Sequence, residues 1–501
     1  MQIKKGFTLL EILLVIAVIG ILSTIVIVAL NPTRQLSQAR NAVRRSNINT
    51  ISSALNQYFI DTQSYPSTLT YWYQDICPSS GGSNCVDINV LVPDYIASIP
   101  VDPNGNQYQI ALNVFDNRPA LRARNAELNQ RIAINPLQSG KRDTSFNIGI
   151  GFNGNVNSIV QQSDGRLVIG GSFTTYQGVS ANGIIRLNLD GSRDTSFNIG
   201  TGFDVGVSSI VQQSDGRLVI GGGFTMYQGI SASRIIRLNL DGSRDTNFNI
   251  GTGFTDNGVN DIVQQGDGKL VAVGGFTAYQ GVGANRIIRL NTDGSRDNTF
   301  NIGTGFTAIG GGTVNDILQQ GDGKFVLVGL FTSYQGVGAN RIIRLNTDGS
   351  RDNSFNIGTG FSNTVDSIMQ QSDDKFIVGG QFVMYQGGFF GNYFLRLNNN
   401  ASVDSLFNHG SAFDSPVTSI IQQSDGKVVV GGWFTDYNGT SANRIIRMNN
   451  DGLVDVDFEI GTGFNDRVFR VFQQSDGKIL VGGIFGTYQD EPVPYLIRLL
   501  P

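Results

Sequence analysis

Residues 156–197 read VNSIVQQSDGRLVIGGSFTTYQGVSANGIIRLNLDGSRDTSF, and variants of this stretch follow one another up to Pro501. The phrase Gln-Gln-Ser/Gly-Asp occurs seven times, at steps of 51, 52, 55, 51, 52 and 51 residues. A period of this size is typical of an array in which each copy forms one supersecondary unit. The seven phrases begin at Gln161, Gln212, Gln264, Gln319, Gln370, Gln422 and Gln473.

Each unit carries the signals of three short strands and a fourth. An alternating run at 156–162 precedes an Asp-Gly turn, and a second run occupies 166–173. A third run at 184–188 leads through another Asp-Gly turn to 193–198. Alternating runs joined by Asp-Gly are typical of β-hairpins, and four strands in a repeat of this length indicate a propeller blade. We therefore predict a mainly β protein with a C-terminal seven-bladed β-propeller.

The two ends of the repeat region complement each other. The last unit reaches Pro501 before its fourth strand, whereas residues 139–147 match a fourth strand and precede the first unit. A strand from the beginning of the region can therefore complete the last blade and leave no open sheet edge. We predict a propeller over 139–501 that is closed by residues 139–147.

The repeats resemble the delta-60 repeat family of β-propellers. The resemblance rests on a Gly two residues before Phe173, on Arg-Leu-Asn at 186–188 and on Asp-x-x-Phe-Asn at 194–198, and it covers residues 139–501. It implies the fold but no defined chemistry.

Three sets of residues recur in all seven units, and we expect them to be structural. Asp194 and its equivalents are expected to brace turns, and Gly171 and its equivalents to allow a close backbone approach or a bulge. Two interpretations remain for Tyr176 and its equivalents. The favoured one is packing between blades, and the other is an aromatic surface offered to a glycan or a protein.

Irregular loops concentrate on one face of the predicted propeller. In an up-and-down blade, the loop before the first strand and the loop between the second and third strands share a face, and these loops vary most between units. The segment 387–394 departs furthest. We predict Phe389, Phe390 and Tyr393 as candidate aromatic anchors for a partner. Neutral drift in loops is an equally good explanation.

Composition argues against catalysis and against a nucleic-acid partner. The formal charge is −4, and His409 is the single histidine of the chain. Only two glutamates, Glu459 and Glu491, follow residue 138. No metal-ligand spacing, nucleophile elbow or phosphate loop is present in the sequence. We therefore expect a protein that is not an enzyme and has no cofactor or metal.

The N-terminus, MQIKKGFTLLEILLVIAVIGILSTIVIVAL, is a long apolar segment behind a short basic leader. From Phe7 to Leu30 every residue is apolar, Gly, Ser or Thr, except Glu11. A helix of this length covers about 36 Å, enough to cross a bilayer core of about 30 Å. A carboxylate in such a span is expected to have a partner and a function. We predict a transmembrane helix over 7–30.

This segment resembles the N-terminus of a type IV prepilin or pseudopilin. The resemblance implies that residues 1–6 form a leader removed by a prepilin peptidase after Gly6, and that Phe7 is then N-methylated. It implies that Glu11 pairs with the N-terminal amine of a neighbouring pilin subunit. The alternative is an ordinary membrane anchor with one misplaced glutamate.

Residues 31–115 fit the remainder of a pilin-like domain of α+β type. Apolar residues recur at helical spacing and indicate a stem helix that packs on a small domain. They are Leu36, Ala39, Val43, Ile48, Ile51, Leu55 and Tyr58. Cys77 and Cys85 are predicted to form a disulfide if the domain is exported, and free thiols are the alternative. Residues 116–138 are expected to be a connector, with a short helix over 120–132.

The sequence thus predicts a pilin-like subunit, minor or at a filament tip, that displays a propeller for adhesion or recognition of an extracellular protein or glycan. One alternative is a pseudopilin of a type II secretion or DNA-uptake system. Another is a membrane-anchored propeller that does not polymerise. The expected location is a single membrane pass with the C-terminal part outside the cytoplasm, and finally a pilus or the cell surface. Four arginines at 34–45 oppose this orientation under the positive-inside rule, but the cleavage motif is the more specific signal.

Overall fold

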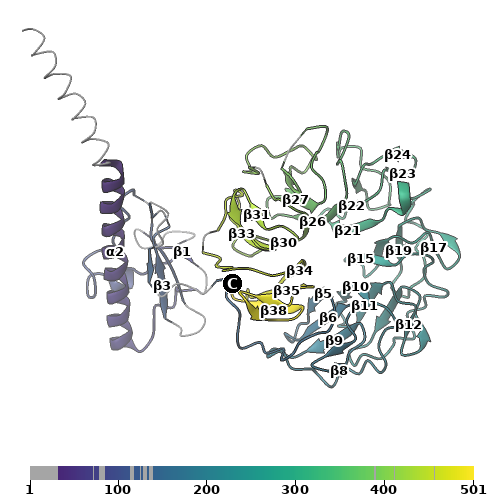
Figure 1. Ribbon diagram of the computed structural model, residues 1–501, viewed down its shortest axis with the longest axis horizontal. Coiled ribbons are helices and arrows are strands. Elements are labelled where there is room, and N and C mark those ends of the chain that lie inside the picture. The colour runs from purple at the N-terminus through teal and green to yellow at the C-terminus, as the bar shows by residue number, and fades with distance from the viewer. Residues whose placement is uncertain are drawn as a thin grey trace, which may run out of the picture. The chain divides into compact units, whose positions relative to one another are not determined.

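The computed structural model describes residues 32–70, 73–77, 85–105, 107–112, 118–124, 126–127, 132–134, 139–388, 391–410, 412–455 and 457–501. The chain forms two compact units, Met1–Leu137 and Gln138–Pro501. Figure 1 shows a helix with a small sheet in the first unit and a ring of small sheets in the second. Each unit is considered by itself below.

The described part of the first unit is one long helix on an antiparallel sheet. Helix α2 spans Pro32–Thr62, and a 3-10 turn, η1, spans Asn89–Leu91. The sheet has the order β1-β2-β3-β4. Its strands are Gln74–Asp75, Gln109–Leu112, Pro119–Arg122 and Ala133–Ile134. Among the helices of the described ranges, none combines the length and the apolar character needed to cross a membrane.

The apolar stripe predicted for the stem helix is correct only in its C-terminal half. Ile48, Ile51 and Leu55 are buried against the sheet. Leu36 and Val43, however, are 56% and 47% exposed. The buried positions one and two turns before Ile48 are polar, Asn41 and Arg44. These polar side chains face the small domain, where acidic residues are their hydrogen-bond partners.

The segment predicted as a connector, 116–138, instead completes the sheet. Strand β3 pairs with β2 through Ile110 and Leu121, and β4 pairs with β3 through Leu121 and Ile134. Ala120 and Leu121 are fully buried. The helix expected over 120–132 is therefore wrong, because burial of this apolar pair in a β ladder outweighs the helical propensity of the residues that follow.

In the second unit seven sheets form a ring. In each sheet the inner strand pairs with the middle strand, and the middle strand pairs with a third. Figure 1 shows inner strands such as β5, β15 and β34 around its middle. Blade 1 contains β5 Val156–Gln161, β6 Leu167–Gly171 and β9 Ile184–Leu187. Blade 2 contains β10 Val207–Gln212, β11 Leu218–Gly222 and β14 Ile235–Leu238. Blade 3 contains β15 Val259–Gln264, β16 Leu270–Gly274 and β19 Ile287–Leu290. Blades 4 and 5 contain β21 Val314–Gln319, β22 Phe325–Gly329, β25 Ile342–Leu345; β26 Val365–Gln370, β27 Phe376–Gly380 and β28 Phe394–Leu397. Blades 6 and 7 contain β29 Val417–Gln422, β30 Val428–Gly432, β33 Ile445–Met448; β34 Val468–Gln473, β35 Ile479–Gly483 and β38 Leu496–Leu499.

The fourth strand of each blade is reduced to a single bridge. In blade 1, Leu187 pairs with Arg193 in this way. In blade 7, Leu499 pairs with Arg142, which precedes the first blade by sequence. The backbone of Asp143 also donates to Arg498 O at 2.8 Å. The ring is thus closed by strand pairing between the two ends of the unit.

The loop between the second and third strands contains a small hairpin that the sequence analysis treated as irregular. In blades 1 to 3 the hairpin strands are β7 Thr175–Tyr176, β8 Val179–Ser180, β12 Met226–Tyr227, β13 Ile230–Ser231, β17 Ala278–Tyr279 and β18 Val282–Gly283. In blades 4, 6 and 7 they are β23 Ser333–Tyr334, β24 Val337–Gly338, β31 Asp436–Tyr437, β32 Thr440–Ser441, β36 Thr487–Tyr488 and β37 Glu491–Pro492. Blade 4 adds β20 Phe306–Thr307 and η2 Ile309–Gly311.

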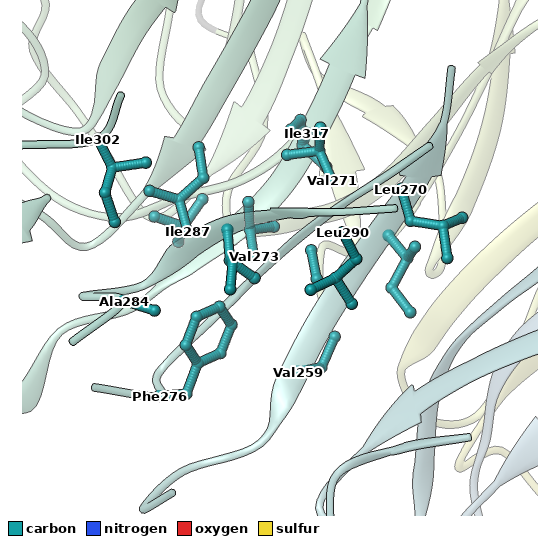
Figure 2. Packing of buried hydrophobic residues seen from close by; sticks show 14 of the residues in the cluster. Val259, Leu270, Val271, Val273, Phe276, Ala284, Ile287, Leu290, Ile302 and Ile317 are labelled. Atoms are coloured by element: carbon teal, nitrogen blue, oxygen red, sulfur yellow. The ribbon is translucent and has the colours of Figure 1, made fainter. Parts of the chain in front are cut away.

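Apolar side chains fill each blade and the junctions between blades. Figure 2 shows this packing around Val273, Phe276 and Leu290. A bulge in the inner strand brings its backbone against the middle strand, so that a Cβ at Gly171 would lie 1.9 Å from Asn155 O. Only glycine fits there, as the sequence analysis expected.

A buried ion pair recurs in every blade. In blade 1, Arg186 Nε donates to Asp194 Oδ2 at 2.6 Å, and Nη1 reaches Leu240 O in blade 2 at 2.7 Å. Asp194 Oδ1 accepts from the backbone of Ser196 at 2.9 Å. The acid therefore braces its turn, as expected. The other pairs are Arg237–Asp245, Arg289–Asp297, Arg344–Asp352, Arg396–Asp404, Arg447–Asp455 and Arg498–Asp143.

Candidate functional site

A polar cluster fastens the stem helix to the small domain. Arg44, fully buried, donates to both carboxylate oxygens of Asp102, with Nε–Oδ2 at 2.6 Å and Nη2–Oδ1 at 3.1 Å. Arg40 makes a similar pair with Glu127, with Nε–Oε1 at 2.5 Å and Nη2–Oε2 at 2.6 Å. The hydrogen bond to Asp102 raises the pKa of Arg44, and that from Arg40 lowers the pKa of Glu127 well below its usual range. Paired in this way, the charges orient the helix end that follows the predicted membrane segment.

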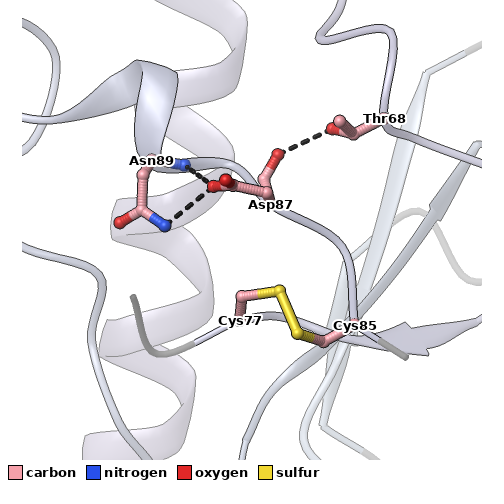
Figure 3. Close-up of a disulfide and its surroundings, with 5 residues drawn as sticks. All are labelled: Thr68, Cys77, Cys85, Asp87 and Asn89. Carbon is pink, nitrogen blue, oxygen red and sulfur yellow. Dashed lines mark hydrogen bonds between the residues drawn. A yellow bond between two sulfur atoms is a disulfide. The ribbon is translucent and has the colours of Figure 1, made fainter. Parts of the chain in front are cut away.

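The cysteine loop lies on the same small domain. The structure joins Cys77 and Cys85 in a disulfide. Figure 3 shows the neighbouring Asp87, whose carboxylate accepts from the backbone N–H of Asn89 at 2.8 Å and whose carbonyl accepts from Thr68 Oγ1 at 2.6 Å. These bonds fix the chain beyond the disulfide.

Several predicted site residues lie outside the described residues. They are Gly6, Phe7 and Glu11 in the N-terminal segment, and Phe389 and Phe390 in blade 5. Tyr393 is described and is half-buried, with its side chain packed on the blade 6 core and its N–H bonded to Phe382 O at 2.8 Å. Its role as a partner anchor stays a prediction.

The tyrosines shared by all blades belong to the core. Tyr227 is 1% exposed, and its hydroxyl donates to Gly242 O at 2.6 Å. Burial raises its pKa. The other six, Tyr176, Tyr279, Tyr334, Tyr385, Tyr437 and Tyr488, are buried in the same way. The alternative of an exposed aromatic ring of tyrosines is therefore wrong.

His409 also has a structural role. Its Nε2 accepts the backbone N–H of Arg396 at 3.1 Å. Burial, with the Arg396 charge, lowers the pKa of His409 to about 4. The imidazole is thus a neutral acceptor at neutral pH, and it ties the chain after Phe407 to strand β28 of blade 5.

The inner strands carry a ring of polar side chains that link one blade to the next. Ser158 Oγ accepts from the N–H of Ile210 at 3.1 Å. Asp316 Oδ2 accepts from Ile368 N at 2.8 Å. At this position the seven blades carry Ser158, Ser209, Asp261, Asp316, Ser367, Ser419 and Arg470. Four members are serine, so the two acids and the arginine break the repeat.

The two acids are neighbours within this ring. Asp261 Oδ1 accepts from Ser209 Oγ at 2.9 Å, and burial together with Asp316 raises the pKa of Asp261. The charge of Arg470, on the blade 7 inner strand, lowers the pKa of Asp261. Burial also raises the pKa of Asp366, on the blade 5 inner strand, to about 6. The two acids and the arginine at this repeat position were not predicted from the sequence, because only residues shared by all units were compared. The signal was the replacement of serine at one repeat position.

Comparisons with known proteins agree with both units. Residues 31–115 match the family described as type II secretion system (T2SS), protein G, and residues 1–27 match the prokaryotic N-terminal methylation motif. The type II secretion system core protein G of Pseudomonas aeruginosa is 33% identical over 106 residues, which are 21% of this chain and 72% of that protein. The chain belongs to the type II secretion system protein G family. The Escherichia coli member is 33% identical over 113 residues, covering 21% and 70% of the two chains.

Beyond the part shared with the protein G family, the chain matches a second family over seven segments. It is described as a domain of unknown function (DUF5122) beta-propeller. The segments are 162–197, 213–248, 265–300, 320–355, 371–407, 423–458 and 474–501. The prediction of a pilin-type N-terminus followed by a seven-bladed propeller is confirmed.

Two solved structures are similar to this member of the protein G family. The WD40 domain of Doa1 has a TM-score of 0.44 and 15% identity, covering 72% of this chain and 97% of that chain. The streptogramin B lyase structure has a TM-score of 0.38 and 17% identity, covering 71% and 95%.

Proposed function

We propose that the protein is a minor or tip subunit of a pilus-like filament that displays its propeller for adhesion or recognition. The observation that carries the proposal is the closure of the ring by its own chain. Tyr488 donates to Gly140 O at 2.5 Å, and Arg498 Nε to Asp143 Oδ2 at 2.7 Å. A ring completed internally needs no partner to fold, so it can serve as a display domain on a filament-forming unit.

The size of the propeller supports a rare position in the filament. The unit Gln138–Pro501 is more than twice as long as Met1–Leu137. A domain of this length has a radius of gyration of about 20 Å. Subunits that each carried such a domain would crowd one another along a filament, whereas a single subunit at the end would not.

Family membership supports the assembly step. Proteins of the pilin and pseudopilin type imply processing by a prepilin peptidase and assembly with other pilin subunits. Exposed apolar side chains on α2, Leu36, Val43 and Ile60, offer a surface for such neighbours. In this proposal the propeller lies outside the cytoplasm and binds a protein or glycan without converting it.

The second candidate is a pseudopilin of a secretion system, in which the propeller contacts cargo. The identity of about a third to core protein G favours it. Both candidates begin with cleavage after Gly6. They differ in where the processed protein accumulates, at the cell surface or in the membrane.

Mass spectrometry of the N-terminal peptide, from membrane and sheared-surface fractions, separates these candidates. We expect a peptide that begins at methylated Phe7 in the sheared fraction. A Glu11→Leu variant should be processed but absent from that fraction, while a Glu491→Gln variant, at an exposed position of the propeller, serves as a matched loss of one acid elsewhere. Processed protein confined to the membrane would support the pseudopilin. Intact Met1 in both fractions would leave an anchored propeller.

A further inference from the structure

One junction of the propeller gathers aromatic and cationic residues that the other junctions lack. Trp433 follows β30 in blade 6, where the other blades have Ser172, Gly223, Gly275, Leu330, Gln381 and Ile484. Arg467 precedes β34 in blade 7, where the others have Asn155, Gly206, Gly258, Thr313, Thr364 and Pro416. The Arg467 guanidinium carbon lies 4.0 Å from the centroid of the Trp433 ring. Two departures from the repeat are thus in direct contact.

A second arginine reaches the same place. Arg444 pairs with this loop through its backbone, since its N–H donates to Phe434 O at 2.8 Å and its carbonyl accepts from Gly432 N at 3.0 Å. Its Nη1 donates to Phe434 O at 3.1 Å. Phe434 is the residue after Trp433, so the Arg444 guanidinium lies at the loop that carries the indole.

Donors at this junction are left without acceptors. Within the described residues, neither Trp433 Nε1 nor Arg444 Nε has a hydrogen-bond partner, although both atoms are buried. A buried donor without a partner is unfavourable, because it has lost its hydrogen bond to water. The nearest acid along the chain, Asp466, accepts the backbone N–H of Arg467 at 2.8 Å. Among the described residues, Arg341 Nε at the equivalent position of blade 4 is also buried without a partner, so the donor particular to this junction is Trp433 Nε1.

Arg444 also occupies a backbone conformation that glycine would adopt more easily. Its φ is 69°, and blade 1 has Gly183 at the same position with a φ of 75°. In blades 2 and 3 an arginine at this position has a structural purpose. Arg234 Nη2 donates to Asp256 O at 2.7 Å, and Arg286 Nε to Gly312 O at 2.5 Å, both in the next blade. Arg444 makes no such bond among the described residues, whereas the positive φ itself is common to this position in all seven blades and belongs to the fold.

We propose that Trp433, Arg444 and Arg467 form a binding site for an acidic polysaccharide, with a uronate-type sugar against the indole and its carboxylate on the guanidinium groups. Planar carboxylates accept paired hydrogen bonds from arginine, and the indole N–H supplies a further donor. The apolar C–H face of a sugar ring packs on the flat aromatic face that Arg467 covers in the free protein.

This inference deepens the proposed function, on which it rests, by naming the ligand class of the displayed propeller. It is tested on the purified full chain in detergent, independently of filament assembly. The chain has two tryptophans, so a Trp72→Phe background leaves Trp433 as the single indole reporter. Oligogalacturonate is titrated as the probe, with a sulfated oligosaccharide and neutral dextran as comparison arms.

We expect oligogalacturonate to change the Trp433 emission saturably, and dextran to leave it unchanged. Arg467→Gly and Arg444→Gly, each the residue of another blade, should weaken binding about tenfold or more. Arg286→Gly is the matched control, because it removes an arginine from the same backbone position in blade 3, and it should bind as the parent does.

Three outcomes would overturn the site. The first is no saturable change with oligogalacturonate, and the second is an equal loss in Arg286→Gly. The third is tighter binding of the sulfated oligosaccharide than of oligogalacturonate, which would mean that the site takes a sulfate ester and not a uronate. A Phe7-terminated peptide in the sheared fraction together with a failed titration would leave the display function standing and remove only this ligand.

Discussion

Two buried arginines, one in each unit, solve the same physical problem in different ways. Arg44 pairs with Asp102, 58 residues away, and it is the one fully buried arginine in the described part of the first unit. Arg237 pairs with Asp245, eight residues away, and the arrangement recurs in all seven blades. In each case an ion pair is removed from water and needs further hydrogen bonds to be tolerated.

The difference lies in what surrounds each pair. Arg237 also donates to Thr292 O in the next blade and lies 4.8 Å from the Phe248 ring centroid. It therefore belongs to a motif that can be recognised from its repetition. Arg44 is held by the turn that begins at Asp102, which is distant from it along the chain. A singular contact of long sequence separation should be more fragile than a repeated local one, and the following predictions test this.

The largest effect is expected for Arg44→Ala. It leaves the Asp102 carboxylate buried without its partner, which costs about 3–5 kcal/mol of the free energy of unfolding. Thermal unfolding of the full chain should show the transition of the N-terminal unit shifted downward and that of the propeller unchanged. Val43→Ala, at an exposed neighbouring position, serves as the control. Equal stability of the Arg44→Ala and Val43→Ala variants would contradict this prediction.

Arg237→Ala and Arg498→Ala probe the repeated pair inside the ring and at its closure. Each should cost about 3 kcal/mol, because each leaves an aspartate buried and unpaired. Only Arg498→Ala should also raise amide hydrogen exchange at 140–143, since that strand pairs with 498–500. The same exchange pattern in both variants would mean that closure does not depend on this pair.

Asp261→Ser restores the residue of the other blades and should stabilise the propeller above neutral pH. The folded-state pKa of Asp261 is raised above its unfolded value of about 3.9. Its contribution is therefore favourable at low pH and is lost as the pH rises through the folded pKa. We expect a gain of about 1–2 kcal/mol at pH 8 and little at pH 4, measured by thermal unfolding. Asp267→Asn, in an exposed turn of the same blade, is the control for the loss of one carboxylate.

The smallest effect is expected for Tyr227→Phe. The hydroxyl bond to Gly242 O is lost while the ring packing stays, so the cost should be about 1 kcal/mol. Chemical denaturation measures it. A much larger loss would show that these tyrosines hold the blades together through the bond and not through packing.

Much of the architecture could be predicted because repetition and periodicity are properties of the chain itself. Seven copies of a hairpin pattern imply seven blades, and the order of their parts implies which strand completes the last one. Asp261 and Arg470 could not be found from the residues that all units share. They stand out because they replace the serine that other blades have at this position. Residues 120–122 could not be placed, because a strand of four residues is decided by its ladder partners.

The sequence was sufficient for the membrane-type leader motif, the pilin-type N-terminus and the number of blades, since each depends on local pattern. Tertiary structure alone decided that Arg44 faces the small domain while Val43 faces solvent, and that Trp433, Arg444 and Arg467 meet. Such contacts join residues from different turns or blades. Their energy comes from burial and pairing that exist only when the chain is folded.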